Sequence, residues 1–108
     1  MTTFDDRERA FEAKYAMDQD TLFKIIARRN RLFGQWAAEK MGLTAEETEA
    51  YAKAVIQADF EEAGDGDVIR KVLGDLTSAG IDITEGGVRA ALEEKAVEAR
   101  RQFIEAQQ

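Results

Sequence analysis

Proline, the residue that interrupts helices most strongly, does not occur in the 108 residues of this chain. Average usage would give about five prolines in a chain of this length. Apolar residues recur at spacings of three and four, as along one face of an α-helix, and no segment alternates with a period of two over more than a few residues. The sequence therefore predicts a single all-α domain.

Capping residues and glycines divide the chain into four helical segments joined by short turns, which predicts an antiparallel four-helix bundle. Thr44 and Glu47 form a capping box that marks the start of the second segment, and Gly64 is expected to end it. Further signals mark the other boundaries: Gly42 after the first segment, Asp65 or Asp67 at the start of the third, Gly80 at its end, and Thr84 at the start of the fourth.

The helical pattern weakens at residues 18–21, where the side chains favour caps and turns. We therefore divide the chain into an N-terminal arm, 1–20, which is helical or frayed, and a bundle domain, 21–108. The arm carries charges of both signs around Phe4, Phe11 and Tyr15 and buries little by itself, so it suits a helix that folds in a partner's groove. In the alternative interpretation, these aromatic residues cover the end of the bundle.

Composition excludes several classes of function. The chain has no cysteine and no histidine, which removes thiol chemistry, zinc–thiolate sites and the commonest general base. Its net charge of −7 argues against binding to nucleic acid or to an anionic membrane. The longest apolar runs are three residues, far short of a membrane span, and the start of the chain does not resemble a signal peptide. We expect a protein that has no enzymatic activity, holds no metal and does not insert into a membrane.

Two charges fall within apolar faces that are predicted to form the core. Arg29 lies in the face that runs from Leu22 to Trp36 in the first helix. Asp59 lies in the face of the second helix, which begins at Ala52 and includes Phe60. Each charge would be costly to bury alone, so one hypothesis is that the two residues form a structural pair that fixes the register of the helices. The alternative is that both reach solvent at an edge of the bundle.

Charge is unevenly distributed along the chain. Residues 21–43 carry five bases and one acid, and residues 44–63 carry one base and six acids. The basic block, Lys24, Arg28, Arg29 and Arg31, is either paired with the acidic second helix or available to a phosphate or an acidic partner. The candidates for nucleotide or phosphate contact are either Arg28, Arg29 and Arg31 or the Gly86-Gly87 turn. A small nucleotide-sensing or adaptor bundle is therefore the alternative function, and weak nucleotide binding is the only cofactor interaction that we consider.

Several longer strings of residues carry a resemblance to a known family. They are FDDRERAFE at 4–12, ARRN at 27–30, WAAEK at 36–40, AYAK at 50–53 and ADFEEAGD at 58–65. In these strings the chain resembles the zeta subunit of alphaproteobacterial F-type ATP synthases, a small family of ATPase inhibitors. The resemblance covers nearly the whole chain. Tyr15 and Met17 depart from it, because they stand where we expect phenylalanine and histidine.

The resemblance implies a regulatory subunit that binds the catalytic head of the synthase, formed by its alpha, beta and gamma subunits. The arm would enter a catalytic interface as a helix and block ATP hydrolysis, while the bundle would dock on the outside of the head. The protein would then be cytoplasmic and peripheral to the inner membrane. By position in the chain, the residues of the contact segment would be Phe4, Asp5, Asp6, Arg7, Glu8, Arg9, Phe11, Glu12, Lys14 and Tyr15.

Overall fold

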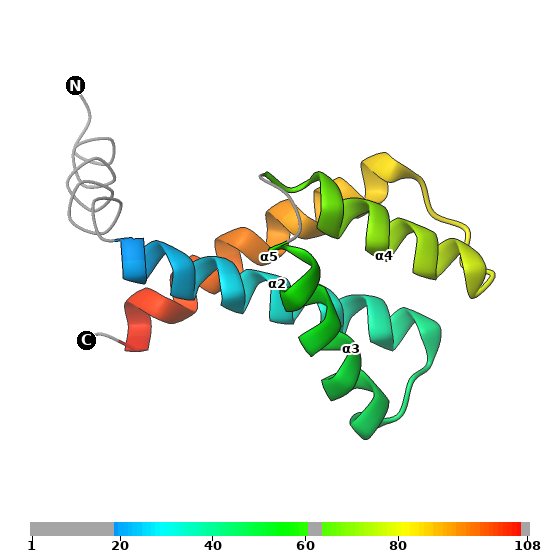
Figure 1. The fold of residues 1–108 in the computed structure, drawn as a ribbon, viewed down its shortest axis with the longest axis horizontal. Coiled ribbons are helices and arrows are strands. Elements are labelled where there is room, and N and C mark those ends of the chain that lie inside the picture. The colour runs from blue at the N-terminus through cyan, green and yellow to red at the C-terminus, as the bar shows by residue number, and fades with distance from the viewer. Residues whose placement is uncertain (1–18, 61–63, 107–108) are drawn as a thin grey trace.

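The computed structural model describes residues 19–60 and 64–106, and within these ranges it consists of four helices without a strand (Figure 1). This confirms the predicted all-α bundle. The interpretations that concern residues 1–18 lie outside the described residues. The helices are α2 (Gln19–Met41), α3 (Ala45–Ala58), α4 (Gly66–Ser78) and α5 (Glu85–Ala106).

Local capping explains where three of these helices begin or end. The Thr44 hydroxyl accepts a hydrogen bond from the Glu47 amide at 3.1 Å, and the Glu47 carboxylate accepts one from the Thr44 amide at 2.8 Å. The predicted capping box is therefore confirmed. Thr84 caps α5 in a similar way, since its hydroxyl accepts a hydrogen bond from the Gly87 amide at 3.1 Å. Gly80, which follows α4, adopts a φ of 82°, a conformation that favours glycine.

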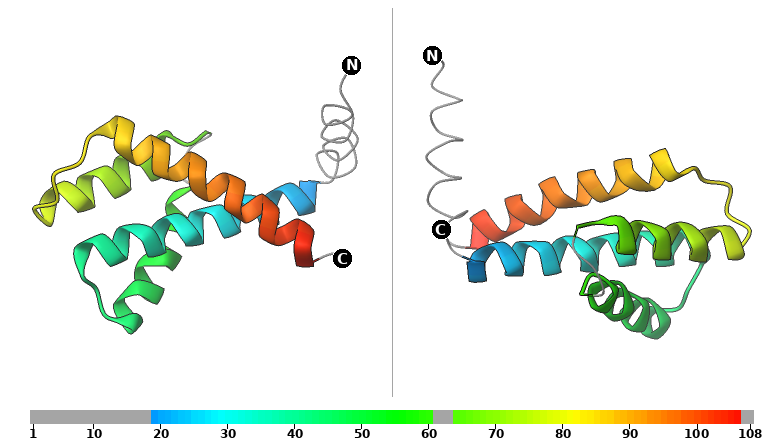
Figure 2. Two further views of the ribbon diagram at one scale, coloured as in Figure 1. Left: turned by 180° about the vertical axis from the view of Figure 1, so that it is seen from behind. Right: turned by 45° about the horizontal axis from the view of Figure 1, so that its top comes forward.

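The helices differ in length, and this difference shapes the molecule. By helical rise, α2 and α5 are each about 33–35 Å long, whereas α3 and α4 are about 20 Å long. The start of α2 and the end of α5 lie side by side at one end of the molecule, and α3 and α4 cover the other end (Figures 1 and 2). The core lies under the two short helices and consists of Phe33, Ala37, Val55, Ala58, Val68, Ile69, Val72, Leu76, Val88, Ala91 and Leu92.

The backbones of α2 and α3 come into direct contact at Gly34. A Cβ atom built on Gly34 would lie 2.8 Å from the Cα atom of Ala52 and 3.3 Å from a methyl group of Val55. These distances leave no room for a side chain at residue 34. Glycine at this position therefore permits close packing of the two helices.

A polar link joins α3 to α4. The Tyr51 hydroxyl donates a hydrogen bond of 2.7 Å to the Asp75 carboxylate, which also forms an ion pair of 3.2 Å with Lys71. The Lys71 ammonium lies 5.2 Å from the centre of the Tyr51 ring. Burial, together with the hydrogen bond and the charge of Asp75, raises the pKa of the Tyr51 phenol. The phenol therefore keeps its proton and remains a donor.

Three sequence predictions about the core were wrong. Helix α3 ends at Ala58 and not at Gly64; Asp59 is its C-cap, and the Asp59 carboxylate lies 3.8 Å from Arg29 of α2. Phe60 consequently lies beyond the helix and is 64% exposed. Leu22 is 44% exposed. Its turn of α2 lies at the end of the molecule that the two short helices do not cover (Figure 1).

Candidate functional site

The contact segment implied by the family resemblance lies outside the described residues. All ten of its residues, from Phe4 to Tyr15, precede Gln19, where α2 begins. The structure therefore describes the part of the molecule to which the arm is joined. That part is the first turn of α2, together with the end of α5 beside it (Figure 2).

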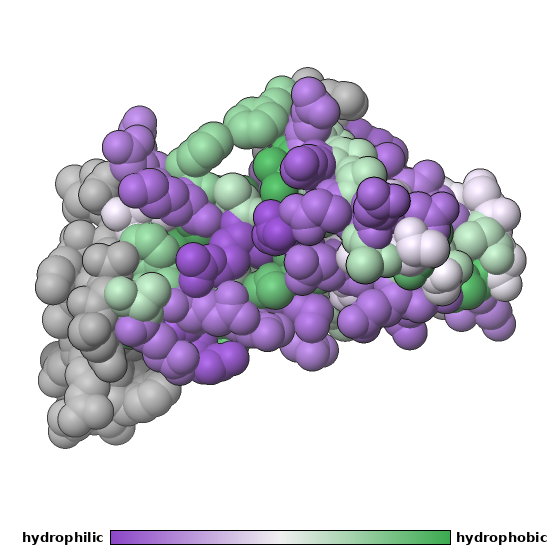
Figure 3. Space-filling model, turned by 90° about the horizontal axis from the view of Figure 1, so that it is seen from below, coloured by the Kyte–Doolittle hydropathy of each residue, from purple (hydrophilic) through white to green (hydrophobic). Residues whose placement is uncertain are grey.

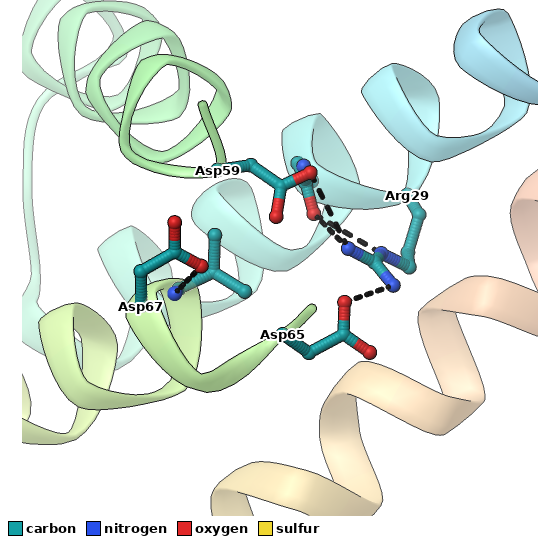
Figure 4. Close-up of polar contacts among 6 residues, drawn as sticks. Arg29, Asp59, Asp65 and Asp67 are labelled. Carbon is teal, nitrogen blue, oxygen red and sulfur yellow. Dashed lines mark hydrogen bonds and ion pairs between the residues drawn. The ribbon is translucent and has the colours of Figure 1, made fainter. Parts of the chain in front are cut away.

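Arg29 is the centre of a polar cluster that joins α2 to both ends of the α3–α4 connection (Figure 4). Its guanidinium forms an ion pair of 3.0 Å with Asp65 and lies 3.8 Å from Asp59. Two of its nitrogens also donate hydrogen bonds, at 3.1 and 2.9 Å, to the side-chain oxygen of Asn30. The Arg29 side chain is only 10% exposed and that of Asp59 only 18%, so the two predicted partners do meet inside the bundle.

Asp65 uses its carboxylate for this cluster and not for capping α4. It occupies the N-cap position of the helix, but its side chain makes no capping hydrogen bond. Asp67, the other residue that the sequence suggested, is buried, and its carboxylate accepts a hydrogen bond of 2.8 Å from the Val68 amide. The start of α4 is therefore fixed to α2 by the ion pair between Asp65 and Arg29.

Two of the four residues of the basic block in α2, Arg29 and Arg31, are engaged within the molecule. Arg31 forms a two-oxygen contact with Glu49 of α3, at 2.8 and 3.0 Å, and Arg29 is held as described above. Both interactions link α2 to the acidic segment 44–63 or to the connection that follows it. Lys24 is exposed and Arg28 is half-buried. The three arginines suggested as a phosphate site thus do not present three free charges.

The Gly86-Gly87 turn is also engaged, because the Gly87 amide donates to Thr84 and the Val88 amide donates to the Thr84 carbonyl. Residues 19–60 and 64–106 contain no group of three acidic, histidine or cysteine side chains placed to hold a metal ion. None of the four described helices is long and apolar enough to cross a membrane.

An apolar hollow of about 110 Å³ opens between α2 and the end of α3, and the sequence reasoning did not find it. Phe23 and Phe60 border it, with ring centroids 5.7 Å apart. In Figure 3, several apolar residues (green) surround a hollow at the upper edge of a face that is otherwise largely polar. We call this site the α2–α3 hollow; it is lined by Phe23, Ile26, Ala27, Asn30, Ile56, Asp59 and Phe60.

The role of Asn30 in the cluster around Arg29 was also not predicted from the sequence. Asn30 is 1% exposed and binds Arg29. A signal was available, because Asn30 lies seven residues before the core residue Ala37 and therefore on the same helical face. A polar residue in that position must find a buried partner.

Comparison with known proteins decides the family. A family profile described as ATPase inhibitor subunit zeta matches residues 1–102. The chain belongs to the ATPase inhibitor subunit zeta family. This confirms the resemblance drawn from the sequence strings, and the match to the zeta family includes both the arm and nearly all of the bundle.

A solved structure supports the fold of this zeta-family chain. A protein determined by solution NMR is 48% identical to it, with an alignment that covers 78% of this chain and 95% of the other. The two folds superpose with a TM-score of 0.69. No curated protein matches the chain.

Proposed function

We propose that this protein is a non-catalytic regulatory subunit that inhibits ATP hydrolysis by the F-type ATP synthase. The observation that supports this proposal is the match to the zeta inhibitor family over residues 1–102, because it spans the arm as well as the bundle. The partner would be the catalytic head, formed by the alpha, beta and gamma subunits. Binding there would keep the protein cytoplasmic, at the periphery of the inner membrane.

The proposed mechanism is steric and electrostatic. The arm, residues 1–20, enters a catalytic interface of the head as a helix, with Phe4, Phe11 and Tyr15 on one face. The inserted helix favours one rotary state over the next, and about 1.4 kcal/mol of differential binding changes the ratio of two states tenfold. No bond of ATP is made or broken by this protein.

The bundle contributes by holding the arm near its site. Because the arm joins the first turn of α2, docking of the bundle on the outside of the head would place residue 18 at a fixed point. A short connection of this kind gives a second contact an effective concentration in the millimolar range. The bundle thereby offsets part of the entropy lost when the arm becomes ordered.

Comparing the full-length protein with residues 20–108 tests the proposal. The truncated protein should keep its fold, since all residues of the core cluster lie between Phe33 and Leu92. With purified ATPase head, full-length protein should inhibit ATP hydrolysis and the truncated protein should not. Equal inhibition by the two proteins would refute the mechanism of arm insertion.

A titration with ADP, followed by NMR, addresses the alternative function of a nucleotide-sensing bundle. We expect no shifts at residues 28–31, because Arg29 and Arg31 already have carboxylate partners. We also expect none at residues 84–88, where the Gly87 amide is occupied. Saturable shifts at either place would instead support a nucleotide site.

A further inference from the structure

The two most exposed aromatic side chains of the described residues lie together. There are four exposed large apolar side chains among the described residues, and two of them, Phe23 and Phe60, line the α2–α3 hollow, while Leu22 precedes Phe23 in α2. The exposed fractions of Leu22, Phe23 and Phe60 are 44%, 54% and 64%. The fourth, Val97, lies on α5 and does not line the hollow. Single exposed apolar residues are ordinary, but an aromatic pair bordering an apolar hollow is typical of a protein-binding site.

The cluster around Arg29 borders this hollow, because Asn30 and Asp59 belong to both. One further turn of α3 would continue its apolar face through Phe60, but the chain leaves the helix at Asp59 and returns at Asp65. Both aspartates bind Arg29, at 3.8 and 3.0 Å, so the connection that presents Phe60 is tied at each end. Phe60 is thus held outside the helix, 5.7 Å from the ring of Phe23.

The chemistry of the hollow favours an uncharged apolar group. Its two polar lining residues, Asn30 and Asp59, both interact with Arg29, so the aspartate charge is offset by the guanidinium. The remaining lining residues are apolar. An apolar cavity of about 150 Å³ holds one benzene molecule. The hollow, at about 110 Å³, therefore suits a single side chain of about the size of leucine or methionine.

The position of the hollow links it to the arm. Phe23 lies four residues after Gln19, which corresponds to about 6 Å along the axis of α2. A partner that binds the arm along its whole length, up to residue 20, therefore comes within about one helical turn of Phe23 and the hollow. Among the described residues, the hollow is therefore an apolar surface within reach of such a partner.

We propose that the α2–α3 hollow is the docking site of the bundle on the ATPase head. It would receive one apolar side chain from the head surface beside the groove that takes the arm, with the rings of Phe23 and Phe60 packed around it. This inference rests on the proposed function and deepens it, because it assigns the outer contact to one face of the bundle.

The test uses full-length protein and purified ATPase head. The variants are Phe60→Asp and the double variant Phe23→Asp/Phe60→Asp, and the matched control is Val97→Asp, which places the same charge on another exposed apolar residue. Loss of an aromatic anchor at an interface should weaken binding about tenfold or more. The Kd for the head and the half-inhibitory concentration should both rise by that factor for the hollow variants and change less than about twofold for the control. Thermal unfolding followed by circular dichroism verifies that each variant is folded.

Two outcomes would overturn the inference. If the hollow variants bind and inhibit as the wild type does, the hollow is not part of the interface. If they inhibit more strongly, the hollow holds the protein's own arm in the free state and competes with the head. The comparison with residues 20–108 keeps this result separate from the proposed function. Loss of inhibition on truncation, combined with unchanged hollow variants, leaves arm insertion intact and refutes only the docking site.

Discussion

Replacement of Gly34 by alanine tests the close contact between α2 and α3. In an exposed helix, changing glycine to alanine stabilises a protein by about 0.5–1 kcal/mol. Here the added Cβ would lie 2.8 Å from the Ala52 Cα atom, which is backbone and cannot rotate away. Overpacking of a core costs about 1–3 kcal/mol, and a backbone clash belongs at the upper end of that range. The gain of about 0.5–1 kcal/mol from replacing glycine offsets part of this cost. We therefore expect Gly34→Ala to lower the free energy of unfolding by about 1–2 kcal/mol.

Gly74→Ala is the matched control, because Gly74 lies inside α4 and an added Cβ would have no heavy atom within 4 Å. It should raise the free energy of unfolding by about 0.5–1 kcal/mol. Urea denaturation followed by circular dichroism measures both changes. For a domain of this size, each kcal/mol also shifts Tm by about 4–8 °C. If Gly34→Ala stabilises the protein as Gly74→Ala does, the helices are not in contact at this point and the argument fails.

Three further substitutions test the polar contacts, each by urea denaturation. Arg29→Leu should destabilise the fold by about 2–3 kcal/mol, because it leaves the mostly buried Asp59 without its cation; a change below about 0.5 kcal/mol would contradict the described cluster. Tyr51→Phe should cost about 1 kcal/mol through loss of the hydrogen bond to Asp75, and an unchanged stability would show that water replaces that bond. Hydrogen bonds from the Thr44 amide and hydroxyl lower the pKa of Glu47 below its ordinary 4.5. The carboxylate therefore contributes stability above pH 4.5 that is lost as the pH falls through the lowered pKa. In Glu47→Gln, the side chain can still cap the helix but cannot ionise. This variant should therefore be less stable than the wild type at neutral pH and equally stable near pH 2 or 3. A difference in stability that does not depend on pH would contradict this reasoning.

The starts of α3 and α5 could be predicted from the sequence because their causes are local. Thr44 satisfies an amide three residues away, as does Thr84, so the signal and its effect share one short window. The end of α3 could not be predicted in this way. Residues 58–63 continue the helical pattern in the sequence, whereas in the structure Asp59 follows the end of α3 and contacts Arg29, which lies thirty residues earlier.

For the candidate site, too, features that depend on neighbouring residues could be predicted from the sequence, and features that depend on distant contacts could not. The family could be recognised from contiguous strings of residues. The α2–α3 hollow could not, because Phe60 fits the apolar face of a longer second helix, whereas α3 ends at Ala58 and leaves Phe60 exposed. The pair of Arg29 and Asp59 could be suggested from the two misplaced charges, whereas its stronger partner, Asp65, gave no such signal because it lies in a turn.

The unequal helix lengths also give the molecule two distinct poles. The start of α2, the end of α5 and the α2–α3 hollow belong to one pole, while the turns at 42–44 and 79–84 belong to the other (Figure 1). A fluorescent label or an affinity handle inserted in either turn would project away from the first turn of α2. The distant pole is therefore the place from which this protein can be immobilised or tracked while the other end is left free to engage a partner.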